Sequence, residues 1–242
     1  MRVALISDVH GNLDAFDAVI ADFGVVDEVW SLGDLVGYGP NPNECVERIH
    51  RFKHICVAGN HDWAAIGKLS TEGFNPLAAS AIAWTSTNMS ADTRTYLESL
   101  PTSVRQEDLT LVHGSPRDHV HEYLFHPYLA VSTLAYLDTQ HCLVGHTHVA
   151  AVFYLNPPAR RADLAHPAPG EVLSFTQDRM IINPGSVGQP RDGIPDARYI
   201  LLDTEAATFC YRRVSYDIAA TQAKMQQAGL PERLSYRLAS GV

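Results

Sequence analysis

Three features are scarce in this sequence: long apolar runs, paired cysteines and positive charge. No apolar run in the 242 residues approaches the ~20 residues that a membrane-spanning helix needs. The four cysteines stand far apart without a CxxC pair, so reduced thiols in a cytoplasm are the simplest interpretation. Residues 1–8 pass from an apolar run to a carboxylate without a small-residue cleavage site, so we expect no signal peptide. We therefore expect a cytoplasmic protein without a membrane partner.

Lysine and arginine number 18 against 27 aspartates and glutamates, which gives a formal net charge of −9. This balance offers no general attraction to phosphate backbones and disfavours a nucleic-acid partner. Hydrophobic residues make up 46% and charged residues 19%, a globular composition that excludes a disordered chain. The length allows one large domain or two small ones. Because no repeat or linker divides the chain, we predict a single domain over residues 1–242.

Five short apolar runs each end in glycine, aspartate, asparagine or histidine. They are residues 2–7, 29–32, 55–58, 109–112 and 142–144. Apolar runs without alternation are typical of strands that are buried on both faces. Helical patterns occupy residues 13–23, 43–52, 76–100 and 127–138. This alternation predicts an α/β fold with largely parallel strand pairing in the first half of the chain.

The second half has a different pattern. Strand-like runs at 152–155, 180–182, 199–203 and 208–214 have little helix between them. We interpret them as a second, more antiparallel sheet packed against the first. Residues 156–178 predict an exposed loop. The tail, 217–239, predicts one or two surface helices that break near Gly229.

Polar residues concentrate at the strand ends, and they include several of the twelve histidines. This set comprises Asp8, His10, Asp34, Asn60, His61, His113, His146 and His148. Ligands of open α/β sheets bind beyond the carboxyl ends of strands, so we expect these side chains to meet. Asp8 and His10 stand two residues apart, as do His146 and His148. Each pair points the same way if the extended conformation continues.

These residue types indicate a metal centre. Oxygen and imidazole ligands together suit Mn, Fe, Co, Ni or Zn better than Ca or Mg. Two carboxylates, one amide oxygen and four imidazoles are too many ligands for one metal and suit two, with one carboxylate bridging. Two-metal sites clamp the attacking and leaving oxygens of a phosphoryl displacement.

The same residues form the motifs DxH, GD, GNHD, HG and GHTH, in this order. Their order and spacing over residues 3–190 resemble the calcineurin-like metallophosphoesterase superfamily. The stretches DVHGN, HGSPRD and NPGSVGQPR are similar to its bacterial and archaeal small phosphodiesterase branch. The resemblance implies an α/β (α+β) fold, a four-layer αββα sandwich of two mixed β-sheets flanked by helices.

The resemblance also implies a role for each ligand. The first metal would be bound by Asp8, His10 and His148. The second would be bound by Asn60, His113 and His146, with Asp34 bridging the two. Manganese is the expected metal, with Fe, Ni, Zn or Co as alternatives. A metal-bridging hydroxide would attack phosphorus in line, and His61 would assist the leaving group.

The chain departs from the superfamily after Asp34. The phosphatase-type continuation GDxxDRG is replaced by Leu-Val-Gly-Tyr-Gly-Pro at residues 35–40. This stretch lacks both the aspartate that would orient His61 and the phosphate-binding arginine, which argues against protein phosphatase activity. Asp62 is a candidate for the missing orienting group, although it equally fits a cap on the next segment.

Two further residues are candidates for substrate binding, Asn12 and Arg191. Asn12 stands just ahead of the helical pattern at 13–23, so it equally fits a helix N-cap. Arg191 follows a stretch rich in glycine and proline, where a purely structural turn is the competing interpretation.

Three functions remain open at this point. The first is a phosphodiesterase that acts on a small phosphate ester or a nucleotide. The second is a pyrophosphohydrolase of the diadenosine-tetraphosphate-cleaving kind, or a phosphomonoesterase, with the same metals. The third is a non-catalytic interaction scaffold, like the retromer subunit that resembles this superfamily, and the complete set of seven ligands argues against it. Homo-oligomerisation is also open.

Overall fold

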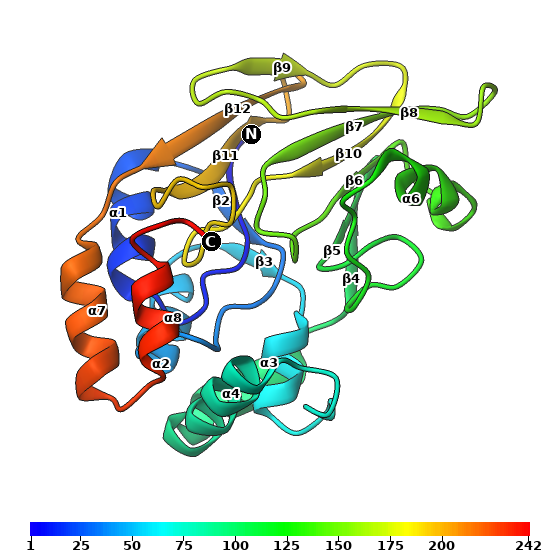
Figure 1. Cartoon of the computed structure of the whole chain (residues 1–242). Coiled ribbons are helices and arrows are strands. Elements are labelled where there is room, and N and C mark those ends of the chain that lie inside the picture. Colours follow the sequence, from blue (N-terminus) through cyan, green and yellow to red (C-terminus); the bar gives the residue numbers. More distant parts are fainter.

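Two mixed six-stranded sheets pack with their inner faces together, and helices flank them (Figure 1). The computed structural model describes residues 1–242. The first sheet contains β1 (Arg2–Ile6), β2 (Glu28–Ser31), β3 (His54–Cys56), β9 (Val172–Ser174), β11 (Ala197–Asp203) and β12 (Thr208–Val214). The second contains β4 (Ser103–Gln106), β5 (Leu109–Val112), β6 (His141–Leu143), β7 (Ala151–Asn156), β8 (Arg161–Ala165) and β10 (Arg179–Asn183). The predicted four-layer sandwich is confirmed.

Strand pairing changes from parallel to antiparallel within each sheet. The first sheet has the order β3-β2-β1-β11-β12-β9, in which β3, β2 and β1 are parallel and the rest are antiparallel. The second has the order β4-β5-β6-β10-β7-β8, with β5, β6 and β10 parallel. The expectation that the later strands form their own sheet is wrong. They instead extend both sheets, because β1 and β6 each leave an open edge for later strands to pair with.

The exposed loop predicted at residues 156–178 is also corrected. This segment contains β8 and β9, which are edge strands of the second and first sheet respectively. Their side chains are mostly exposed, so the stretch has no apolar run to reveal it. Main-chain pairing to β7 and β12 holds these strands in place, and such pairing leaves little trace in the sequence.

Helices cover the outer faces and one end of the sandwich. They are α1 (Leu13–Phe23), α2 (Pro42–Ile49), α3 (Asn60–Ala65), α4 (Pro76–Asn88), α5 (Ala91–Ser99), α6 (Pro127–Ser132), the 3₁₀ turn η1 (Leu134–Tyr136), α7 (Ile218–Gln227) and α8 (Glu232–Arg237). The helical pattern at 76–100 divides into α4 and α5 because the Ser90 side chain accepts a hydrogen bond from Thr93 N and starts a new helix. The predicted two-helix tail is confirmed as α7 and α8.

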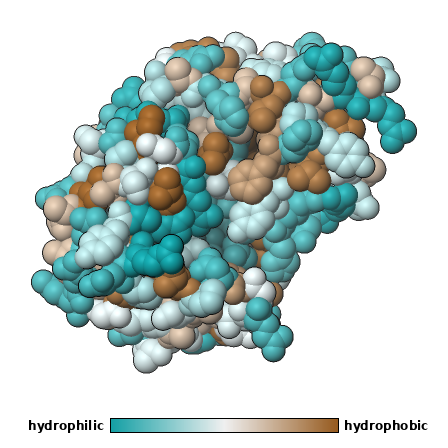
Figure 2. Space-filling view, in the orientation of Figure 1, coloured by the Kyte–Doolittle hydropathy of each residue, from teal (hydrophilic) through white to brown (hydrophobic).

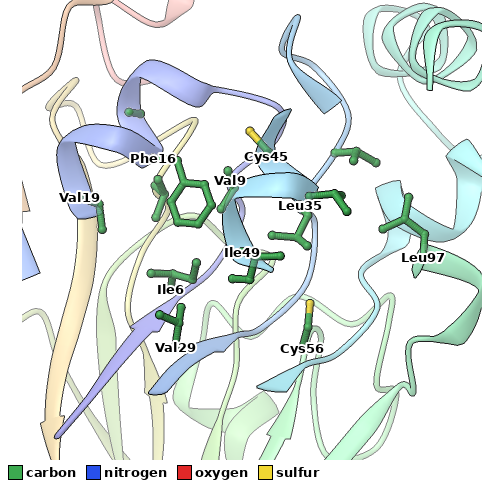
Figure 3. Close-up of a cluster of buried hydrophobic side chains, with 14 of the residues drawn as sticks. Ile6, Val9, Phe16, Val19, Val29, Leu35, Cys45, Ile49, Cys56 and Leu97 are labelled. Carbon is green, nitrogen blue, oxygen red and sulfur yellow. The ribbon is translucent and has the colours of Figure 1, made fainter. Parts of the chain in front are cut away.

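The core between α1 and the first sheet is apolar and closely packed (Figure 3). Phe16 and Val19 of α1 face Ile6 of β1 and Val29 of β2, and all four side chains are fully buried. On the surface view, hydrophobic residues are scattered among hydrophilic ones (Figure 2). No helix is both long enough and apolar enough to span a bilayer.

Truncation of this core tests the packing. Phe16→Ala removes a fully buried ring, so we expect the free energy of unfolding to fall by about 3–5 kcal/mol. Val25 is 87% exposed, and Val25→Ala should change it by less than about 0.5 kcal/mol. Urea denaturation followed by circular dichroism at a fixed metal concentration measures both. Equal losses for the two variants would contradict the assigned packing.

Candidate metal centre

The turns that follow β1, β2, β3, β5 and β6 meet at one end of the sandwich. Three of these strands belong to the first sheet and two to the second, so both sheets contribute to the same site. The strand-end set named from the sequence gathers there, and none of its eight members is more than 7% exposed. The structure therefore brings together every predicted metal ligand, with His61 beside them.

Five of the seven predicted ligands adopt left-handed backbone conformations. These are Asp8, His10, Asp34, His146 and His148, with φ between 51° and 66°. The expectation that the extended conformation continues past the strands is therefore wrong, although both residue pairs still converge. Such conformations cost about 1–3 kcal/mol each for residues other than glycine and persist where surrounding contacts impose them. Here the turns after β1 and β2 brace one another, because Asp8 N and His10 N donate to the carbonyls of Gly33 and Asp34.

Main-chain carbonyls fix the orientation of all four ligand imidazoles. In each ring one nitrogen donates a hydrogen bond outward, so the other nitrogen points inward. The pairs are His10 Nδ1 to Val36 O (3.2 Å), His113 Nδ1 to Leu32 O (2.8 Å), His146 Nε2 to His121 O (3.1 Å) and His148 Nδ1 to Gln189 O (2.6 Å). Histidines that bind metals are commonly held this way.

The inward atoms crowd together without enough hydrogens to satisfy them. His10 Nε2 lies 3.1 Å from His148 Nε2, and His113 Nε2 lies 3.0 Å from both His146 Nδ1 and Asn60 Oδ1. Burial lowers the pKa of both His10 and His148. Both rings are therefore neutral, and with their hydrogens on the outward nitrogens their facing atoms are two bare lone pairs. Only a cation relieves that arrangement.

The two carboxylates complete the donor set. Asp8 Oδ1 and Asp34 Oδ2 are buried and have no hydrogen-bond partner. Asp8 Oδ1 lies 3.3 Å from His148 Nε2, and Asp34 Oδ2 lies 3.4 Å from His113 Nε2 and 3.7 Å from His10 Nε2. Burial alone would raise the carboxyl pKa values, but the positive charge of His113 helps to hold both well below their usual range. Asp34 in turn raises the pKa of His113 to about 9, against the effect of burial.

These donors form groups that fit divalent metals. Asp8, His10 and His148 make one group, and Asp34, His113 and His146 make another. Asp34 also lies in a group with His10 and His61, so its carboxylate stands between the two. Carboxylate oxygen and neutral imidazole are the ligands that first-row divalent ions prefer.

His61 lies at the start of α3 beside this centre. Its main-chain N donates to Asp34 Oδ1 (2.8 Å), and its ring packs against Tyr38 and Phe74 at centroid distances of 4.4 Å and 5.4 Å. Gly37 has φ of +93°, and a Cβ there would come within 2.5 Å of His61 Nδ1. The ring is therefore held by aromatic packing and by close main-chain approach rather than by a carboxylate.

Only one nitrogen of His61 is available for chemistry. Nδ1 is buried without a hydrogen-bond partner and the ring lines the cleft, which leaves Nε2 as the nitrogen that a substrate can reach. Burial lowers the pKa of His61 to about 4. The imidazole is thus neutral near pH 7 and can act as a hydrogen-bond donor.

Asp62 does not orient His61, which corrects that hypothesis. Its carboxylate accepts hydrogen bonds from the main-chain N–H groups of Asp34 (2.8 Å), Gly59 (3.0 Å) and Val36 (3.2 Å). The side chain therefore holds the turn after β2 against the start of α3. Its effect on the metal centre is indirect, through the position of Asp34.

Asn12 is a structural residue, which corrects the expectation of a substrate contact. Its Oδ1 accepts from Ala15 N (3.1 Å) and Thr221 Oγ1 (3.2 Å). Its Nδ2 donates to Gly188 O (2.9 Å) and Tyr216 Oη (3.2 Å). These four bonds use the full hydrogen-bonding capacity of the amide, so Asn12 caps α1 and has no free group for a ligand.

Arg191 lies beside the centre with donors to spare. Its Cζ is 6.0 Å from the Tyr38 ring centroid, and its one side-chain bond is from Nη2 to Gln189 Oε1 (2.9 Å). No aspartate or glutamate lies within ion-pair distance of it. Burial is the main cause of the lowered pKa of His61 and His148, and the positive charge of Arg191 lowers both further. This position suits the predicted phosphate contact, which stays a prediction.

A cleft of about 470 Å³ opens over the centre. Its lining includes Asn60, His61 and His146 together with Phe74 and Tyr123, which the sequence did not single out. Tyr123 stacks on the His146 ring at a centroid distance of 3.6 Å. Its place shortly after the His113 turn is the one sequence signal that could have found it.

Comparison with known proteins now defines the class. The model of the calcineurin-like phosphoesterase superfamily domain matches residues 1–207. The chain therefore belongs to the calcineurin-like phosphoesterase superfamily, as its motifs predicted.

The relatives align with this chain over almost its whole length. The chain is 37% identical to the uncharacterized protein MJ0912 of Methanocaldococcus jannaschii, over 99% of this chain and 98% of that one. A metallophosphoesterase from Sphaerobacter thermophilus is 49% identical, with a TM-score of 0.92 over 100% of this chain and 99% of that one. The hypothetical protein PH1004 of Pyrococcus horikoshii shares the fold at 20% identity, with a TM-score of 0.76 over 100% and 98% of the two chains.

Replacement of the shared carboxylate tests the centre. Asp34→Asn removes the charge that faces both donor groups, so we expect divalent-metal affinity to fall at least about tenfold. Metal content per chain after dialysis against Mn²⁺, measured by mass spectrometry, reports this loss. Asp163→Asn is the matched control, because that carboxylate is exposed on β8 and paired with Arg161. Unchanged metal content in folded Asp34→Asn protein would rule out the assigned centre.

Proposed function

We propose that the protein is a dinuclear-metal-dependent phosphodiesterase that hydrolyses a small phosphate diester. The observation that carries this proposal is the position of Asp34, whose Oδ2 faces His113 of one donor group and His10 of the other. Two divalent ions, with Mn²⁺ as our first choice, supply Lewis acidity to the phosphate and lower the pKa of the attacking water.

The charge and shape of the cleft favour a diester over a monoester. No lysine or arginine is among the residues that line it, and the guanidinium of Arg191 lies 6.0 Å from the ring of Tyr38, which does line it. A diester carries one negative charge where a monoester carries up to two. The uncharged walls, which include Leu69, Phe74 and Ala78, give room for a second ester group.

The chain's own residues then divide the work. Arg191 contacts a non-bridging phosphate oxygen and orients the ester. The neutral His61 ring donates a hydrogen bond from Nε2 to the leaving oxygen and stabilises the charge that develops there. Tyr38 and Phe74 hold the His61 ring in one orientation, so little reorganisation accompanies the reaction.

His61→Ala separates this role from metal binding. We expect kcat for an alkyl ester to fall about 10²–10⁴-fold, with a smaller loss for bis(p-nitrophenyl) phosphate because p-nitrophenolate leaves without assistance. Metal content should stay at the wild-type value. His50→Ala, an exposed histidine at the end of α2, is the control. Unchanged turnover of the alkyl ester would contradict the role of His61.

The diester preference has its own test. The wild-type protein loaded with Mn²⁺ should hydrolyse bis(p-nitrophenyl) phosphate faster than p-nitrophenyl phosphate at equal concentrations. Preference for the monoester would indicate a phosphatase instead. Absence of turnover in protein that holds two metals would favour a binding scaffold.

A further inference from the structure

An aromatic pair, Tyr123 in the lining of the cleft and Phe125 stacked on it, has no role in the proposed chemistry. Tyr123 stacks on His146 with an interplanar angle of 21°, and Phe125 lies parallel to Tyr123, with centroids 5.5 Å apart and an angle of 5°. The three rings form a column that begins at a metal ligand and ends in solvent. We name Tyr123 and Phe125 the aromatic platform.

The platform is tied to the metal centre. His121, two residues before Tyr123, accepts a hydrogen bond from His146 Nε2 through its main-chain oxygen (3.1 Å). Asp118 Oδ1 in turn accepts from His121 N (3.0 Å) and Val120 N (3.2 Å), which fixes the turn that leads to the platform. The distance from the centre to the platform is therefore set by contacts within the chain.

Burial does not explain these two aromatic residues. Tyr123 is 41% exposed and Phe125 is 55% exposed, although both rings are large and mostly apolar. Exposed aromatic surface beside a reactive centre marks a binding region more often than a structural one. The cleft volume of about 470 Å³ lies within the roughly 300–1,000 Å³ range of small-molecule sites.

The shape of the platform indicates what it binds. The two rings are parallel and stacked, so the exposed outer ring, Phe125, presents a flat π-surface, which suits a planar group more than a branched aliphatic one. Because no lysine or arginine lines the cleft, the part of the ligand beyond the phosphate is expected to be uncharged. A nucleoside meets both conditions, since it is neutral and carries a planar base.

We propose that the aromatic platform stacks on the base of a nucleoside, and that the natural substrate is a nucleoside phosphodiester. This inference rests on the proposed phosphodiesterase function and adds the substrate class. Tyr123 lies next to the centre and Phe125 lies farther out, so Phe125 determines specificity without contact with the reacting atoms.

Three esters with one leaving group test the proposal. They are the p-nitrophenyl phosphodiesters of thymidine (at its 5′ oxygen), of abasic deoxyribose and of methanol. For the wild type we expect kcat/KM of the thymidine ester to exceed that of the other two by about tenfold or more, because base–aromatic stacking is worth about 1–3 kcal/mol. Phe125→Ala should remove about tenfold of this preference and leave the methyl ester unchanged. Phe125→Trp should restore it.

The matched control is Tyr128→Ala, which removes a 75% exposed aromatic side chain from α6, a few residues farther along the chain. It should change none of the three rates. Equal rates for the thymidine and methyl esters in the wild type would overturn the platform while leaving the phosphodiesterase intact. Equal kcat/KM values for the thymidine and abasic esters would show that the enzyme recognises the sugar, and would overturn base stacking.

A binding measurement separates this inference from the proposed function. Calorimetry with the metal-loaded protein should show tighter binding of thymidine 5′-monophosphate than of methyl phosphate, with the difference lost in Phe125→Ala. If that difference is seen without turnover of any ester, the platform stands and the phosphodiesterase assignment fails. If the two ligands bind equally in wild type and variant, the platform is refuted, and its exposed rings then suit a protein partner.

Discussion

The structure depends on the burial of two carboxylates whose free oxygens face the imidazoles of the candidate metal ligands. Asp8 Oδ1 and Asp34 Oδ2 have no hydrogen-bond partner, and ring nitrogens of His148, His113 and His10 face them at 3.3 Å, 3.4 Å and 3.7 Å. Buried charge of this kind is unfavourable unless cations balance it. The left-handed turns that carry these ligands add strain to the same place. Both costs are understandable only if metal binding offsets them.

Because the candidate metal centre lies between the two sheets, hydrogen bonds around it also join one sheet to the other. His113 of the second sheet's turn donates to Leu32 O of the first, and His146 N donates to Asp8 Oδ2 (3.2 Å). Ser186 Oγ donates to Asp8 O (2.9 Å) in the same region. Any relative movement of the sheets would therefore change the spacing of the donor groups. Metal binding and sheet packing support one another, since a ligand that binds only the folded state stabilises it.

Close main-chain approach holds these turns together. A Cβ at Gly188 would come within 1.8 Å of Val9 O, and one at Gly145 would come within 2.0 Å of Ser7 Oγ. A side chain at Gly188 would displace the main chain of the turn after β1, and one at Gly145 would displace the Ser7 side chain. The glycines next to the ligand motifs thus serve geometry, as their abundance near the strand ends suggested.

Sequence reasoning located the ligands because each motif follows a strand, and strand ends meet wherever parallel strands pair. The same reasoning could not give the left-handed backbone of Asp8 and His10, since those conformations are imposed by bonds to the turn after β2. It left Asp62 open between an orienting group and a cap, and the structure supports the cap, because two of its three main-chain donors, Asp34 N and Val36 N, come from a segment that only the fold brings to it. Edge strands β8 and β9 were missed for a related reason, because pairing rather than side-chain pattern defines them.

The metal-ligand residues at the base of the cleft and the residues of its walls come from different parts of the fold. The ligands come from turns fixed by sheet pairing, whereas Phe74 and Tyr123 come from segments that lie outside both sheets. Replacement of wall residues can alter what the cleft accepts without moving a donor atom, which is how one fold serves many substrates. His61 connects the two parts, because its main chain bonds to Asp34 while its ring packs on Phe74. Under the proposed function, a change at Phe74 would therefore act on leaving-group chemistry as well as on substrate choice, whereas a change at Phe125, outside this contact, would act on substrate choice alone.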